Sequence, residues 1–291
     1  MKMWNRIELK ERGKASFKKA YGTAIAVCLI LSVISGIFTT VKTSTNKTQQ
    51  PHIVQQTENI KDSFLNIADK AVRFSVPVIS SSGLNRSGIN AIVPLITSGT
   101  AFATIILTLC AVLATLILHF VVLVPLLIGS NRFFMKLRDN KSTQLNNILY
   151  IYEQGKFANA VLIMVLMSVY TLLWTMLLII PGIIKFYEYR MIPYILSENP
   201  GIKPSRAFKL SKEMMSGNKM DLFLLDLSFM GWYFLSYFTL GLLNILYVNP
   251  YVNATNAELY SVLREDVLNR DIADEIDLPG FSEIDTLDII M

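Results

Sequence analysis

Long apolar stretches separated by basic or mixed polar segments form the main pattern of the chain. Four of them stand out, at residues 21–41, 100–128, 158–180 and 221–248. A helix that crosses the roughly 30 Å hydrocarbon core of a membrane needs about 20 mainly apolar residues, and each stretch has that length. With 52% hydrophobic and 17% charged residues among 291, the composition is too apolar for a soluble domain of this size. The pattern therefore predicts an all-α, polytopic membrane protein.

Lysine and arginine are concentrated in three segments. Residues 1–20 contain seven of them against two glutamates, and residues 129–157 and 197–220 contain five each. Because cytoplasmic segments of membrane proteins carry an excess of Lys and Arg, all three segments are predicted to be cytoplasmic. The loop at 42–99 is then predicted to lie outside, and the protein is expected in the cell membrane.

The basic segments on both sides of the third apolar stretch require that the chain cross the membrane twice between them. We therefore predict an outer turn at Pro181–Gly182, after which residues 183–197 return as a short helix. The last stretch is too long for one span, and we split it at Thr239–Gly241. The predicted helical bundle has about six spans in a single domain, residues 1–264, with both termini cytoplasmic: 21–41, 100–128, 158–180, 183–197, 220–238 and 242–264.

An amphipathic helix is predicted in the first outer loop. Its apolar residues recur at helical spacing and share one face: Ile60, Phe64, Ile67, Ala68 and Ala71. This face is expected to pack onto the bundle or to lie on the outer leaflet. A docking surface for a partner or ligand is the alternative.

The C-terminal residues 265–291 form an acidic tail with nine carboxylates and one arginine. A segment of high net charge cannot bury enough apolar surface to compensate for the entropy of ordering. We therefore expect a solvated, disordered cytoplasmic tail, with partner binding as the alternative.

Three sequence segments carry a resemblance to a known family: "LLWTMLLIIPGIIKFYEYRMIPYILSENP", "SKEMMSGNKMDLFLLDLSFMGWYFLSYFTLG" and "NPYVNATNAELYSVL". They cover about 172–263 and resemble domain-of-unknown-function family 975, integral membrane proteins chiefly of Gram-positive bacteria. The N-terminal "LKERGKASFKKAYGTAI" resembles the opening segment of that family. The resemblance implies a multi-pass membrane fold without an assigned activity. Glu188 and Arg190 stand where the family pattern has uncharged residues, so their role is particular to this chain.

Five ionisable residues within the predicted spans form a candidate polar cluster: Lys185, Glu188, Arg190, Asp226 and His119. Such residues are costly in a membrane and are usually paired or functional. Arg190 and Asp226 are both predicted about 10 Å from the inner boundary, so we expect them to form an interhelical ion pair. Lys185 and Glu188 can pair at i, i+3 nearer the outer side. For His119, a neutral ring bonded across helices and a functional group are both open.

Motifs for catalysis are not recognisable in the sequence. The chain has no glycine-rich phosphate loop, no H-E-x-x-H and no G-x-S-x-G pattern. We therefore expect neither an enzyme nor a bound cofactor or metal. A structural, accessory or regulatory membrane component is favoured. The alternative is binding or transport of a small or lipidic solute through a polar cavity between the last four helices.

The basic N-terminus and the apolar spans indicate which partners to expect. The seven basic residues of the N-terminal segment are interspersed with Trp4, Ile7, Leu9 and Phe17, an arrangement that suits contact with an anionic inner leaflet. A purely topological role for these charges is the alternative. Other membrane proteins are a further expected class of partner. Nucleic acid is not, because no nucleic-acid-binding motif is present.

Overall fold

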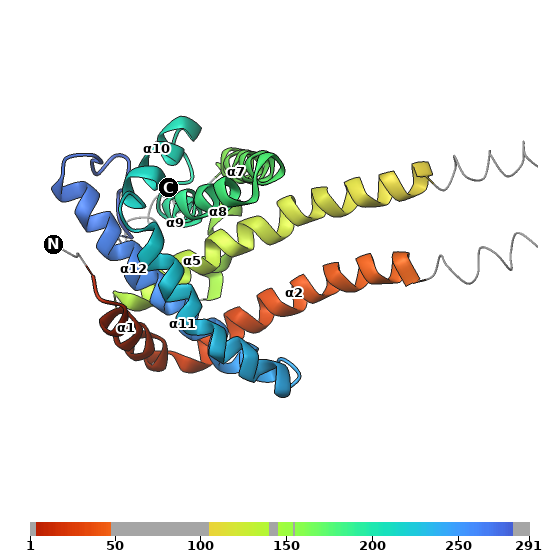
Figure 1. Cartoon of the computed structure of the whole chain (residues 1–291), viewed down its shortest axis with the longest axis horizontal. Helices are drawn as coiled ribbons and strands as arrows, with labels where there is room; N and C mark the ends of the chain where they lie inside the picture. The colour runs from red at the N-terminus through yellow and green to blue at the C-terminus, as the bar shows by residue number, and fades with distance from the viewer. Residues whose placement is uncertain (1–3, 48–104, 140–144, 154, 282–291) are drawn as a thin grey trace, which may run out of the picture. The chain divides into compact units, whose positions relative to one another are not determined.

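The structure is a computed structural model that describes residues 4–47, 105–139, 145–153 and 155–281. Every regular element in these ranges is a helix (Figure 1), so the all-α prediction is confirmed there. The chain forms two units: residues 1–35 with 118–291 make up the first, and residues 36–117 the second. The amphipathic helix predicted in the first outer loop lies outside the described residues.

The N-terminal helix α1 (Arg6–Lys19) begins at Asn5, whose side chain accepts a hydrogen bond from the Ile7 backbone N–H. Helix α2 (Tyr21–Lys47) follows after a bend of 97°. The face of α1 that carries Gly13 packs against the C-terminal helix. A Cβ on Gly13 would lie 2.6 Å from Thr255 Oγ1, so the absence of a side chain permits this close approach of the two helices.

A continuous helix runs from Ile105 to Arg138. It contains a π-helical turn, η1 (His119–Leu123), and ends as α5 (Val124–Arg138), which is buried along most of its length. Two short elements lead from α5 to the next long helix: η2 (Leu145–Leu149) and α6 (Tyr150–Glu153).

Helices α7 (Phe157–Leu177) and α8 (Ile179–Glu188) form a hairpin that turns at Leu178, where the backbone is extended. The prediction that Pro181–Gly182 makes this turn is wrong, since both residues lie in the first turn of α8. Proline fits there because the first N–H groups of a helix need no intrahelical partner. A Cβ on Gly182 would lie 2.4 Å from Thr175 Oγ1, so this glycine lets α8 pack closely on α7.

The remaining elements follow in the order α9 (Ile192–Glu198), α10 (Pro204–Met214), α11 (Lys219–Phe238), η3 (Asn244–Val248) and α12 (Asn249–Asn269). The predicted span 183–197 is wrong as a single helix, because the chain breaks between α8 and α9. Ser211 of α10 stabilises this break: its hydroxyl donates to Glu188 O (2.7 Å) and accepts from Met191 N (3.3 Å). A side chain thus satisfies backbone groups that a continuous helix would pair internally.

Two corrections concern the C-terminal part of the chain. Helix α12 extends beyond the predicted end of the membrane domain at residue 264, and it buries polar side chains such as Asn256 and Glu258. The expectation of a solvated tail is wrong for residues 270–281, where Leu278 is fully buried and Phe281 nearly so. The burial of these two apolar side chains stabilises the segment in spite of its acidic neighbours.

Two described helices are long and apolar enough to cross a membrane, Ile105–Arg138 and Phe157–Leu177. The bent pair of α1 and α2 would add a third if it forms one span. Length and composition therefore support two or three candidate spans in the described part of the chain. The other predicted spans are represented by helices that are shorter, broken or more polar.

Candidate functional site

A cluster of charged side chains connects the end of α8 with α11. At its centre lies Glu188, which is only 4% exposed. Its Oε1 accepts a hydrogen bond from Lys185 Nζ and its Oε2 accepts one from Lys219 Nζ, both at 2.8 Å. A buried carboxylate is thereby held by two ammonium groups, one from its own helix and one from the next long helix. Such paired charges are much less costly to bury than a single one.

The second carboxylate of the cluster belongs to Asp226 on α11. Its Oδ1 lies 3.6 Å from Arg190 Nη2, and its Oδ2 accepts a hydrogen bond from the Tyr187 hydroxyl at 3.1 Å. The interhelical pair expected from the sequence is therefore present, as an ion pair somewhat longer than a hydrogen bond. Tyr187 adds a direct hydrogen bond that the sequence analysis missed.

Lys219 is a further member of the cluster that the sequence did not identify. It is the first residue of α11, and its contact with Glu188 places that carboxylate beside the beginning of this helix. The Lys185–Glu188 pair predicted at i, i+3 is present at 2.8 Å, and its position nearer the outer side stays a prediction. Sequence reasoning counted Lys219 as a topological charge, and its position at the start of an apolar helix was the signal that could have marked it as a partner.

The structure brings four of the five candidate residues together and places the fifth on another helix. His119 lies in the π-helical turn η1, where its exposed ring packs edge-on against Phe120 with the ring centres 5.4 Å apart. A short π-helical insertion often reorients side chains near functional positions.

A second buried carboxylate, absent from the sequence-based candidates, organises the C-terminal end of the chain. Glu198 has a fully buried side chain. Its Oε1 accepts hydrogen bonds from Arg264 Nε (2.7 Å) and Gly280 N (2.6 Å), and its Oε2 accepts one from the Tyr260 hydroxyl (2.7 Å). Three chain segments far apart in sequence thus meet at one side chain. Its position after an apolar run, in "ILSENP", gave no local indication of these partners.

The segment 270–281, which we call the C-terminal strap, is fastened to α10 and α12. Arg206 donates to Asp277 Oδ2 through Nε (2.9 Å) and Nη2, and Arg264 donates to Leu278 O (2.7 Å). The hydrogen bond from Arg206 lowers the pKa of Asp277 below its ordinary value of 3.8, and the same contact raises the pKa of Arg206. The charged form of each side chain is therefore favoured by the other.

Replacing Asp277 by asparagine should loosen the strap by about 1–2 kcal/mol, since a charged hydrogen-bonded pair is lost. Because folding lowers the pKa of Asp277, this tether is present above pH 3.8 and is lost as the pH falls through the lowered value. Hydrogen exchange of residues 270–281 measures the opening. Asp271→Asn is the matched control, because Asp271 is exposed in the same segment with a positive φ that asparagine tolerates. Equal exchange in both variants would contradict the tether.

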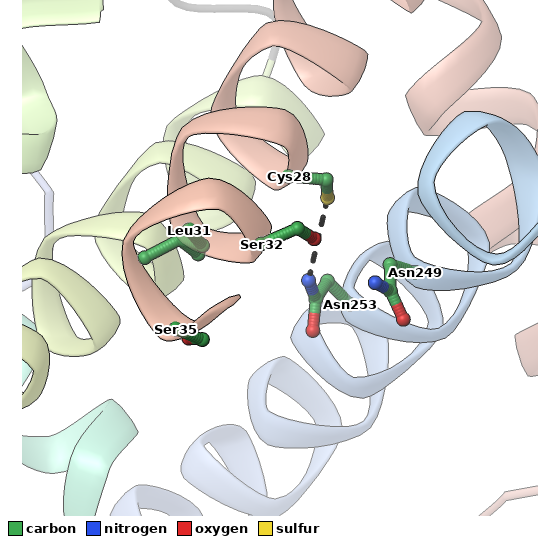
Figure 2. A pocket seen from close by; sticks show the side chains of 6 residues that line it. All are labelled: Cys28, Leu31, Ser32, Ser35, Asn249 and Asn253. Atoms are coloured by element: carbon green, nitrogen blue, oxygen red, sulfur yellow. Dashed lines mark hydrogen bonds between the residues drawn. The ribbon is translucent and has the colours of Figure 1, made fainter. Parts of the chain in front are cut away.

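A cavity of about 270 Å³ lies between α2 and α12 (Figure 2). Asn249 and Asn253 project from one face of α12 toward α2, and Asn253 Nδ2 lies 3.7 Å from Cys28 Sγ as a weak hydrogen bond. Uncharged groups line this cavity: Cys28, Leu31, Ser32, Ser35, Asn249 and Asn253. Amide and hydroxyl groups can bind a neutral polar group, but they provide no charge for an ionic ligand. The four charged candidates do not line it.

The described ranges contain no group of three or more His, Cys, Asp or Glu side chains that could hold a metal ion. The carboxylates Glu188, Asp226 and Glu198 are each engaged with cations or hydrogen-bond donors from the chain itself.

Comparison with known proteins places the chain in a family. A family model described as "Protein of unknown function (DUF975)" matches residues 1–266. The chain belongs to this family. No curated protein and no solved structure matches it. The DUF975 match covers the charged cluster, Glu198 and the cavity, and it ends before the C-terminal strap. Since the function of the family is unknown, a functional proposal depends on the geometry.

Proposed function

We propose that the protein is an integral component of the cell membrane with a structural, accessory or regulatory role, in which charged side chains fasten helices to one another. The observation that carries this proposal is the mutual neutralisation of the cluster. Glu188 accepts from Lys185 and Lys219, and Asp226 pairs with Arg190. Charges that are already paired within the protein stabilise one arrangement of helices and have little capacity left for a charged solute.

The proposal places both termini on the cytoplasmic side. In this arrangement α1 lies on the anionic inner leaflet, with its apolar face packed on α12 and its basic residues outward. Exposed basic residues on α1 include Arg6, Arg12, Lys14 and Lys18. Each cation close to an anionic surface contributes about 1 kcal/mol to membrane binding. Helix α2 and the helix from Ile105 are proposed to cross the membrane, while the hairpins α7–α8 and α11–η3 enter it. In the six-span version, both hairpins cross completely.

Binding or transport of a small or lipidic solute is the second candidate function. The cavity between α2 and α12 favours it, since its lining offers several uncharged hydrogen-bonding groups. We place this candidate second because the cavity differs from the expected path between the last four helices. The charged cluster, which was the expected lining of such a path, is occupied by its own ion pairs.

Exchanging the charges of one ion pair tests the structural role. Arg190→Ala and Asp226→Ala should each lower the yield of folded protein and the midpoint of thermal unfolding in detergent, because each leaves one charge poorly compensated. The double exchange, Arg190→Asp with Asp226→Arg, should recover part of the loss. Arg12→Ala is the matched control, since the Arg12–Glu8 pair is half exposed on α1 and should contribute less than about 1 kcal/mol.

Two results would contradict the structural role. If the double exchange is as unstable as the worse single variant, the pair does not fasten α8 to α11. Normal folded yield in both single variants would likewise mean that the two charges serve another purpose, and the solute-binding candidate would then take precedence.

A further inference from the structure

The turn between α7 and α8 has an entirely apolar and exposed tip. From Met176 to Ile184 the sequence is "MLLIIPGII", which contains no polar side chain. The exposed fractions at the turn are large: Met176 79%, Leu177 70%, Leu178 61%, Ile179 72% and Ile180 72%. Turns that reach water are usually built from Gly, Asn, Asp, Ser and Pro. This tip instead has the composition of a surface that contacts hydrocarbon.

The turn between α11 and η3 has a similar surface. Its exposed side chains are mostly aromatic or aliphatic: Tyr237 80%, Phe238 67%, Leu240 99% and Leu242 60%. The hydroxyl of Thr239, in the middle of the turn, donates to Ser236 O within the chain. Leu240 has a positive φ of 52°, a conformation that water-exposed turns normally assign to Gly or Asn. Both hairpins therefore end in apolar tips.

The base of the α7–α8 hairpin contacts α10, a helix that carries exposed lysines. The Phe208 ring of α10 packs against the rings of Tyr170 (5.5 Å) and Tyr189 (5.0 Å), one on each arm of the hairpin. Lys209 and Lys212 on the same helix are exposed. An exposed lysine is not stable in hydrocarbon, so α10 lies in water or among headgroups. Tyr170 and Tyr189 then mark the membrane interface, where tyrosine is enriched.

The length of the hairpin above this level is about half a bilayer. Leu178 lies eight residues after Tyr170 and eleven before Tyr189, which corresponds to about 12 and 16 Å at 1.5 Å per residue. The hydrocarbon core is about 30 Å thick. Although α7 has the length of a span, one face of its first part packs against other helices through Ala160, Ile163 and Met164, and Asn159 donates to the carbonyl of Pro200 (2.8 Å). Because these contacts tie the first part of α7 to the segment before α10, we place only the remainder of the helix in the membrane.

Contacts with the N-terminal helices set the base of the α11–η3 hairpin. Lys10 of α1 donates to Ser228 Oγ (3.2 Å), and the Tyr21 hydroxyl at the start of α2 donates to Leu246 O (3.2 Å). Leu240 lies twelve residues after Ser228 and six before Leu246, or about 18 and 9 Å along the two arms. The second tip thus also reaches only about the middle of the hydrocarbon when α1 lies at the interface.

We propose that the α7–α8 and α11–η3 hairpins are re-entrant: both enter from the cytoplasmic side and end near the bilayer midplane. Their apolar tips contact acyl chains of the inner leaflet, and neither turn reaches the outer surface. This inference depends on the cytoplasmic position of α1 and α10 in the proposed function. It leaves α2 and the helix from Ile105 as the crossing segments, and it confines the lipid contacts of the two hairpins to the inner leaflet.

Single cysteines in a chain without Cys28 and Cys110 test the depth of both tips. Leu178→Cys and Leu240→Cys are conservative changes at exposed positions, and Ser205→Cys, exposed on α10, is the matched control. With a membrane-impermeant maleimide, Ser205→Cys should react only after the cells are permeabilised. Both tip variants should fail to react in either condition and should react after denaturation in detergent. A fluorophore on each tip cysteine, in vesicles, should be quenched more by lipids with a nitroxide near the chain end than near the headgroup.

The outcomes separate the inference from the proposal on which it depends. Reaction of a tip cysteine in intact cells, with Ser205→Cys still protected, would overturn the re-entrant hairpin and support the six-span arrangement. Stronger quenching by the nitroxide near the headgroup would also overturn it. Reaction of Ser205→Cys in intact cells would instead overturn the cytoplasmic position of α10, and with it the proposed topology.

Discussion

Replacing Glu198 by alanine should lower the free energy of unfolding by about 3–5 kcal/mol, one of the two largest effects we expect for a single substitution. The carboxylate is fully buried and accepts from Arg264, Tyr260 and the Gly280 backbone. Its removal leaves the partly buried Arg264 guanidinium without its counter-charge and two further donors without their acceptor. Unlike the loss of a surface ion pair, this cost is not recovered by contact with water.

Thermal unfolding of the detergent-solubilised protein measures the effect of Glu198→Ala. Limited proteolysis should also show earlier cleavage in the C-terminal strap. Glu198 of α9 accepts from Gly280 N in the strap, and it also binds Arg264, which donates to Leu278 O of the strap. Glu265→Ala is the control, because Glu265 is an exposed carboxylate on α12 and should change stability by no more than about 0.5 kcal/mol. A similar stability for both variants would mean that Glu198 does not hold these segments together.

Replacing Glu188 by alanine should be comparably severe, at about 3–5 kcal/mol, because it leaves the ammonium groups of Lys185 and Lys219 without their shared carboxylate. The cost arises from uncompensated charge, so removing one of the charges should reduce it. Combining Glu188→Ala with Lys219→Met should therefore recover part of the lost stability. The methionine keeps the apolar stem of the lysine and removes its charge.

The measurement for this pair of variants is the thermal midpoint together with the fraction of monodisperse protein after purification. Lys219→Met alone is the control, since it leaves Glu188 with Lys185 as a partner and should cost less than Glu188→Ala. If the double variant is less stable than Glu188→Ala, the two side chains contribute independently, and the charge-compensation account of the cluster is incorrect.

The candidate site could be anticipated from sequence to the extent that its members lie on apolar helices. A charge in such a helix needs a partner of opposite sign, and this argument led to Arg190 with Asp226 and to Lys185 with Glu188. The same argument did not identify Lys219 and Tyr187 as partners. A lysine at a helix start is also explained by membrane topology, and a tyrosine by a position near the membrane interface. His119 was included for its type alone, and the structure places it on another helix.

The turn of the α7–α8 hairpin shows why some local interpretations were wrong. Proline and glycine together usually indicate a turn, yet Pro181 and Gly182 begin α8, and the turn lies at Leu178. The choice depends on how α8 packs against Thr175 of α7, where only a glycine leaves enough room. A contact between two helices decides the position of the turn, and no pattern along one segment contains that information.

The sequence by itself determined the helical class and the apolar stretches, because hydrophobic patterns depend on residues within a few turns of one helix. It also determined the family, through the residues of the three matching segments. The tertiary structure alone decided that the chain breaks between α8 and α9, where Ser211 of α10 bonds the backbone. It also decided how the strap is held and that Glu198 joins Tyr260, Arg264 and Gly280. Glu198 and Gly280 are 82 residues apart. Such a contact depends on the packing of several helices at once, and a buried carboxylate gains its partners only after those helices have met.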